Sequence, residues 1–185
     1  MENEIFKGSL LDIGLSNQGI VYNIYKQFND DINVEYINGK DEQENIRENY
    51  YDNCIMLFSF DRMCFNFKKK NFIMDIHRYL NKNGLLHIWD IDKGYNKIFY
   101  GDIKIAIPGG KLKKIKIRDF NILKNSSKEN TLKLLDGYFE ILDSRNSDGI
   151  YYIKARKKNP LVKNHDDLER SEERRVGKEC RSRWS

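Results

Sequence analysis

A short stretch near the N-terminus has the residue types of a cofactor-binding turn. Residues 10–13 form an apolar run interrupted only by Asp12, as a strand buried on both faces requires, and a turn with glycines follows. Residues 20–28 then carry apolar side chains at helical spacing. A strand, a tight turn and a helix start can hold a nucleotide-like cofactor, because glycine admits close backbone approach and the helix start offers free N–H groups. The candidate residues here are Asp12, Gly14, Ser16 and Gly19.

Strands and helices alternate along the chain and would position this turn. Apolar runs predict strands at 7–15, 32–37, 54–60 and 84–91, and helical spacing predicts helices at 20–28 and 69–83. A two-sided hairpin is expected at 103–117, a helix at 127–137, and strands at 138–142 and 150–155. This order indicates an α/β fold with a mostly parallel sheet that ends in a C-terminal antiparallel β-hairpin. Ligands of such sheets bind at the carboxyl ends of strands, where Gly14, Asn38, Ser59 and residues 90–92 fall.

Short sequence motifs predict where several helices and turns begin or end. Asn83-Gly84 predicts the end of the helix at 69–83, and Ser126 with Glu129 predicts a capping box at the start of the next helix. The lysine run 68–70 predicts the solvated start of a helix, and residues 108–110 predict a hairpin turn rather than a phosphate loop.

Composition limits the class of protein. The 185 residues suffice for one domain, 39% are hydrophobic, and no apolar run is long enough to span a membrane. The acidic start without an apolar signal region and an odd number of cysteines, three, predict a cytoplasmic protein. Abundant Lys, Asn, Ile and Tyr are typical of AT-rich bacterial genomes.

The end of the chain differs in composition from the rest. Residues 170–185 hold six basic and three acidic residues, so residues 1–169 carry 27 basic and 25 acidic ones and are nearly balanced. The last 16 residues contain five Arg, against six in the preceding 169. We therefore expect a domain at 1–159, a disordered tail at 160–185, and a non-native, vector-derived origin for 170–185; a native basic tail that binds nucleic acid or anionic lipid is the alternative.

Three stretches together resemble the class I S-adenosylmethionine-dependent methyltransferases over residues 5–158. LLDIGLSNQG resembles the family's first motif, NFIMDIHRYLNKNGLLHIWDI its later helix, turn and strand, and TLKLLDGYFEILDSRNSDGIYYIKARKK its last helix and terminal hairpin. The resemblance implies a Rossmann-like three-layer sandwich, S-adenosyl-L-methionine as cofactor, and methyl transfer to an unidentified acceptor. It implies cofactor binding by Asp12, Gly14, Ser16, Gly19, Asn38 and Ser59.

The chain departs from this family at three places. The family pattern is D-x-G-x-G-x-G, and here Ser16 and Gln18 occupy two of the glycine positions. Asn38, with Glu35 as the backup, stands where the family has an acid that binds the ribose hydroxyls. Residues 39–54 are too few for a helix and a full strand, so the family's third strand is expected to be shortened or lost.

No motif identifies the acceptor or a catalytic residue. The place of the family's Asn-Pro-Pro-aromatic motif reads Ser-Phe-Asp-Arg, and Asp61 or Asp92 is either a base or a cap at a strand end. His77 and His87 are expected to be structural, and no spacing indicates a metal site. The acceptor is a small molecule or unidentified, with no membrane partner, nucleic acid not expected, and the oligomeric state open.

Two other functions compete with methyl transfer. The altered glycine turn, Asn38 and the short third strand suit a catalytically inactive methyltransferase-fold protein that acts as a binding or interaction module. A nicotinamide-binding Rossmann domain would need an intact GxGxxG and an acid after the second strand, which the sequence lacks.

Overall fold

The structure is a computed structural model that describes residues 6–14, 20–21, 34–38, 46–107 and 111–159. Its main sheet has six strands in the order β2-β1-β3-β4-β8-β7. The strands are β1 (Leu10–Gly14), β2 (Val34–Asn38), β3 (Tyr51–Leu57), β4 (Leu80–Ile91), β7 (Phe139–Ser147) and β8 (Ile150–Lys157). No helix within the described residues is both long and apolar enough to cross a membrane.

The sheet is mixed, which corrects the expectation of a mostly parallel one. β1 pairs in parallel with β2 and β3, and β3 pairs in parallel with β4. β8 pairs antiparallel with both β4 and β7. The reversal between β7 and β8 takes place at Asp148 and Gly149, which both have positive φ (53° and 73°) and so allow a tight turn. Because this turn sends β8 back beside β7, two of the five strand pairings become antiparallel.

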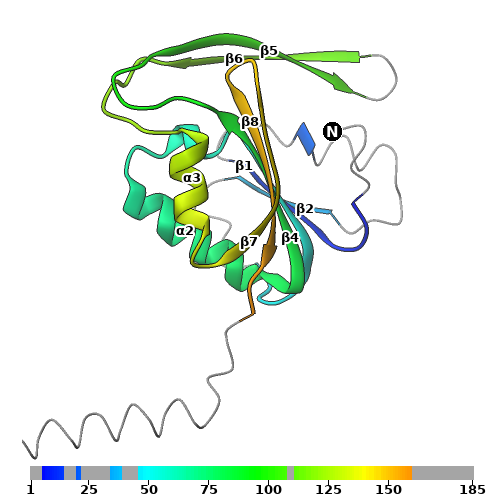
Figure 1. The fold of residues 1–185 in the computed structure, drawn as a ribbon. Helices are drawn as coiled ribbons and strands as arrows, with labels where there is room; N and C mark the ends of the chain where they lie inside the picture. Colours follow the sequence, from blue (N-terminus) through cyan, green and yellow to red (C-terminus); the bar gives the residue numbers. More distant parts are fainter. Residues whose placement is uncertain (1–5, 15–19, 22–33, 39–45, 108–110, 160–185) are drawn as a thin grey trace, which may run out of the picture.

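Two helices cover one face of the sheet (Figure 1): α2 (Asn66–Tyr79) and α3 (Lys128–Leu135). In α2 the buried side chains Phe72, Ile73, Ile76 and Tyr79 lie on one side of the helix, and they pack against β-strand residues such as Leu86. The side chains between these helices and the sheet form the larger of the two apolar clusters. Their packing holds in place the parallel strands on which the candidate site depends.

A separate two-stranded sheet follows β4: β5 (Phe99–Ile107) pairs antiparallel with β6 (Lys111–Asp119). Figure 1 shows this hairpin beyond the end of β4 and beside the β7–β8 turn. Ile117 belongs to the same apolar cluster as Leu57 and Phe58 at the end of β3, and Ile103 and Ile115 pack against that cluster. The alternating pattern of this segment is thus confirmed as a hairpin with one apolar face, placed at the carboxyl end of the sheet.

Three predicted boundary details are wrong. α2 begins at Asn66 and ends at Tyr79, because Leu80 already has extended backbone (φ −67°, ψ 142°) and pairs with Tyr51 of β3. Ser127, not Ser126, is the N-cap of α3, and its side chain accepts a hydrogen bond from the Asn130 N–H. The lysine run is not entirely solvated, as the site below shows.

Candidate functional site

The carboxyl ends of β1 and β2 lie side by side. Gly14, the last residue of β1, is the direct partner of Asn38, the last residue of β2, and Ile13 is the partner of Met56 in β3. The structure therefore brings Gly14 and Asn38 together at the carboxyl edge of the sheet, with Asp12 two residues further into β1. The other two residues of the predicted turn, Ser16 and Gly19, lie outside the described residues.

Asp12, the central residue of β1, is fully buried. Cys54 lies on the neighbouring strand β3. Burial raises the pKa of the Cys54 thiol well above its ordinary value, and the negative charge of Asp12 adds to that increase. Asp12 thus places a carboxylate within the parallel part of the sheet, two residues before Gly14.

Ser59 fixes the end of β3 to the end of β1. Its hydroxyl is buried and donates a hydrogen bond of 2.9 Å to the carbonyl oxygen of Ile13. The residue before it, Phe58, has a φ of 53°, which is uncommon for a bulky residue, and its N–H donates to the Trp89 carbonyl at 2.8 Å. The chain is thus forced into a sharp change of direction where β3 ends, and backbone strain of this kind gathers at ligand sites.

The acidic residues at the end of β4 hold loops in place. Asp90 is fully buried, and its carboxylate accepts hydrogen bonds from the Phe60 N–H (2.7 Å) and the Ile91 N–H (2.8 Å). Asp92 accepts from the Lys128 N–H at 2.9 Å, at the start of α3, and from the Asn146 side chain. Asp92 therefore holds the start of α3 and contacts Asn146 of β7, and the side chain of Asp61 is not among those described.

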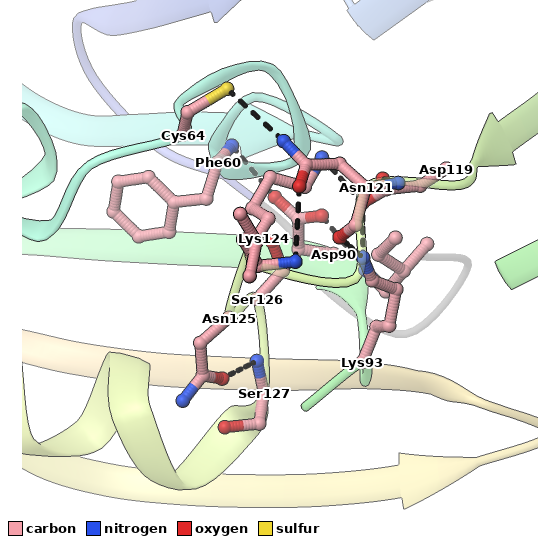
Figure 2. A network of polar contacts seen from close by, with 12 residues as sticks. Phe60, Cys64, Asp90, Lys93, Asp119, Asn121, Lys124, Asn125, Ser126 and Ser127 are labelled. Carbon is pink, nitrogen blue, oxygen red and sulfur yellow. Dashed lines mark hydrogen bonds and ion pairs between the residues drawn. The ribbon is translucent and has the colours of Figure 1, made fainter. Parts of the chain in front are cut away.

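A buried cluster of charged residues lies next to Asp90 (Figure 2). The Asp119 carboxylate forms ion pairs with Lys93, at 3.1 Å, and with Lys124, and all three side chains are at most 6% exposed. Burial favours the neutral carboxylic acid, but the hydrogen bonds from Lys124 and Lys93 outweigh it and hold the pKa of Asp119 below its ordinary value. The cluster joins the end of β6 to the segment after β4, so it anchors the hairpin to the sheet.

Lys69, within the predicted solvated run, is also buried. It lies in the first turn of α2, and its ammonium group donates to the carbonyl of Asn125 at 2.7 Å and lies 3.4 Å from the Ser126 hydroxyl. Sequence reasoning missed Lys69, Lys93, Lys124 and Asp119 because each is an ordinary surface residue type, and nothing in their spacing distinguishes them from solvated charges.

Both candidate histidines make structural contacts. A ring nitrogen of His77 lies 2.9 Å from the Lys158 carbonyl, and a ring nitrogen of His87 lies 2.9 Å from the Tyr152 hydroxyl. Within the described part of the chain, no three His, Cys, Asp or Glu side chains are close enough together to hold a metal ion.

A surface hollow of about 560 Å³ lies at the opposite edge of the sheet. It is lined by residues at the starts of β3 and β4, among them Asn53, Asn81 and Leu85, together with Lys7. It is separate from the edge formed by Gly14, Asn38 and Ser59, so it is not part of the predicted cofactor site.

The fold of the chain is similar to that of several solved structures, although the sequence comparisons find no match. No family model and no curated protein matches the sequence. Among solved structures, the [4+2]-cyclase SpnF is 16% identical with a TM-score of 0.57, and the match covers 84% of this chain and 77% of that one. A SAM-dependent methyltransferase from Methanosarcina mazei is 14% identical (TM-score 0.54, 84% and 95% covered), and one from Aquifex aeolicus is 13% identical (TM-score 0.53, 81% and 82% covered). The chain thus has the fold found in class I SAM-dependent methyltransferases.

Proposed function

We propose that this chain binds S-adenosyl-L-methionine at the carboxyl ends of β1, β2 and β3 and transfers its methyl group to an acceptor. The observation that carries the proposal is the direct pairing of Gly14 with Asn38, together with the Ser59 hydroxyl bound to the Ile13 carbonyl. Ligands of open α/β sheets bind at such an edge.

Each residue at this edge has a role in the proposal. Asp12 would interact with the amino end of the cofactor, and Gly14 would let the backbone approach the ligand. Ser16 and Gly19, which lie outside the described residues, would complete the binding residues of this stretch. Asn38 accepts a hydrogen bond from a ribose hydroxyl. Ser59 holds the end of β3 against β1 and so sets the width of the site.

The main contribution of the protein to this reaction would be to align the acceptor with the methyl group of the cofactor. The cofactor, when bound, supplies an electrophilic methyl group on a sulfonium centre, and the acceptor must approach it in line. Holding two reactants in this geometry can itself supply a large share of the rate increase, so the site needs no single catalytic residue. This agrees with the engagement of Asp90 and Asp92 in structural hydrogen bonds.

Fold alone does not decide the reaction, since one structural neighbour is a [4+2]-cyclase. Cofactor binding is therefore tested first, by titration calorimetry of the full chain with S-adenosylmethionine and S-adenosylhomocysteine, with NAD as the control ligand. We expect binding of both sulfur ligands and none of NAD. If no heat of binding is detected with about 1 mM S-adenosylmethionine, the binding free energy is less than about 4 kcal/mol, and the proposal is refuted.

A further inference from the structure

The β5–β6 hairpin has two chemically different faces. Its inward face is apolar and belongs to the core: Ile117 is buried and Ile103, Ile105 and Ile115 are half-buried. The residues that alternate with these are exposed: Tyr100, Asp102, Lys104, Leu112, Lys114, Lys116 and Arg118, four of which are basic. Successive side chains of a strand point to opposite faces, so these residues form one outward face, which we call the basic face.

Positive charge is concentrated on this hairpin. Residues 99–119 contain six basic and two acidic residues, a net charge of +4. Residues 1–169 as a whole carry 27 basic and 25 acidic residues, so the rest of that segment has 21 and 23, a net charge of −2. The near balance of the whole segment therefore conceals a basic hairpin on a slightly acidic body.

The charges of the basic face are only partly balanced by the hairpin itself. Asp102 lies directly opposite Lys116 in the antiparallel register, which leaves Lys104, Lys114 and Arg118 without an acidic cross-strand neighbour. One of the hairpin's two acids, Asp119, is buried and bound to Lys93 and Lys124. Lys104 lies directly opposite Lys114 in the antiparallel register, and like charges in that position destabilise a sheet. Within the described residues, no ion pair involves Lys104, Lys114, Lys116 or Arg118. An anionic partner with several charges would relieve this repulsion.

Exposed aromatic rings lie at the open end of the same hairpin. Tyr100 is 64% exposed, and the Arg118 guanidinium carbon lies 5.2 Å from its ring centroid. Phe120, one residue beyond β6, is 61% exposed. Cations that follow a phosphate backbone, next to aromatic rings on which bases stack, are the combination by which proteins bind single-stranded nucleic acid.

We propose that the basic face of the β5–β6 hairpin binds single-stranded nucleic acid, with Lys104, Lys114, Lys116 and Arg118 on the phosphates and Tyr100 stacked on a base. An anionic membrane fits less well. Membrane-surface elements insert their apolar face into the lipid, and the apolar face of this hairpin is packed against the sheet. The proposal does not depend on cofactor binding, although a strand bound here would lie beside the carboxyl edge of the sheet.

The first test is fluorescence anisotropy of a labelled oligouridylate with the full chain, without S-adenosylmethionine. We expect the double variant Lys114→Gln/Lys116→Gln to weaken binding about tenfold and to reduce the salt slope by about 1.4, since each phosphate contact of a single strand contributes about 0.7. The matched control is Lys70→Gln/Lys133→Gln, which removes the same charge from exposed positions on α2 and α3. The control should change affinity less than twofold at about 150 mM salt. The basic residues 170–185 are present in every variant and cancel in the comparison.

A second variant tests stacking independently of charge. Tyr100→Ala should weaken binding about fivefold or more, whereas Phe67→Ala, which removes a ring that is 60% exposed on α2, should not. Failure of the unsubstituted chain to bind the oligonucleotide, equal losses in the two lysine variants, or no loss with Tyr100→Ala would each overturn the proposal. Binding to phosphatidylserine vesicles but not to the oligonucleotide would assign the face to membranes instead. Because cofactor is absent throughout, these outcomes are independent of whether S-adenosylmethionine binds.

Discussion

The carboxylate of Asp119 lies 3.1 Å from the ammonium nitrogen of Lys93, and both side chains are almost entirely buried. Asp119 is the last residue of β6, and Lys93 follows β4 by two positions, so this ion pair closes the base of the hairpin. Lys93 also donates to the Asn121 carbonyl at 2.6 Å, which ties the segment after the hairpin to the same point (Figure 2). The position of the hairpin over the carboxyl edge therefore depends on a few buried charges.

Replacing Asp119 with Asn should destabilise the protein strongly. The side-chain size is kept, but two buried ammonium groups lose their common counter-charge, and breaking a buried pair in this way costs about 3–5 kcal/mol. Urea unfolding followed by circular dichroism measures the change. The matched control is Asp143→Asn, which breaks the Arg145–Asp143 pair (2.7 Å), in which Arg145 is exposed and Asp143 half-buried, and should cost less than about 1 kcal/mol. If the two substitutions lower the free energy of unfolding equally, the buried ion pairs of Asp119 do not stabilise the fold more than a surface ion pair does.

The stability difference between the original chain and Asp119→Asn should depend on pH. The pKa of Asp119 is lower in the folded state than its ordinary value, so its ionised form stabilises the fold. That contribution is complete above the unfolded-state pKa, near 4, and is lost as the pH falls through the folded-state pKa. Urea midpoints of the two proteins should differ most at neutral pH and converge below about pH 4. A difference that stays constant down to pH 3 would contradict the assignment of this charge.

Much of the central sheet was predictable from sequence because it depends on apolar runs alone. The runs around Leu11, Ile55 and Ile88 each form a strand, and the alternation of strands with helices predicted that such strands pair in parallel. The two-sided hairpin was predictable for the same reason, since its isoleucines alternate with charged residues.

The local predictions that proved wrong share one physical cause: tertiary contacts override the preference of the local sequence. Asn83-Gly84 has the composition of a helix end, but Gly84 is a residue of β4 that lies close to the side chain of Leu80 and the carbonyl of Tyr51. Lys69 has the composition of a solvated face, but carbonyl and hydroxyl groups of the segment before α3 accept its hydrogen bonds. At the candidate site, the sequence predicted that Gly14, Asn38 and Ser59 lie at strand ends, whereas the hydrogen bond from Ser59 to Ile13 has no local signature.

Gly84 gives a direct test of that close approach. A Cβ added there would lie 2.9 Å from the Leu80 Cβ and 3.0 Å from the Tyr51 carbonyl oxygen, and backbone atoms cannot move aside easily. Gly84→Ala should therefore lower the free energy of unfolding by about 1–3 kcal/mol. Gly137→Ala is the control, because no atom lies within 4 Å of its added Cβ, and we expect a change of less than about 0.5 kcal/mol. If Gly84→Ala proves neutral by chemical denaturation, the start of β4 is not packed as described.

The two cysteines of the described chain should react at very different rates. Cys54 is fully buried in β3, and burial raises the pKa of its thiol, with the charge of Asp12 adding to the effect. Cys64 is exposed. N-ethylmaleimide at neutral pH, followed by peptide mass spectrometry, should label Cys64 in the native protein and Cys54 only after urea is added, because the thiolate is the reactive form. Rapid labelling of native Cys54 would contradict the burial of β3 between β1 and β4.

Asn38, at the end of β2, provides a test of the proposed cofactor site. A carboxylate at the end of β2 would accept charge-assisted hydrogen bonds from the ribose hydroxyls, which are stronger than those accepted by an amide by about 1 kcal/mol. Asn38→Asp should therefore tighten S-adenosylmethionine binding about fivefold in titration calorimetry. Because the ligand is a cation, any added negative charge attracts it, so Asn83→Asp, at an exposed position near the opposite edge of the sheet, is the control and should change affinity less than twofold. Unchanged or weaker binding by Asn38→Asp, in a chain that does bind the cofactor, would place the ribose away from β2.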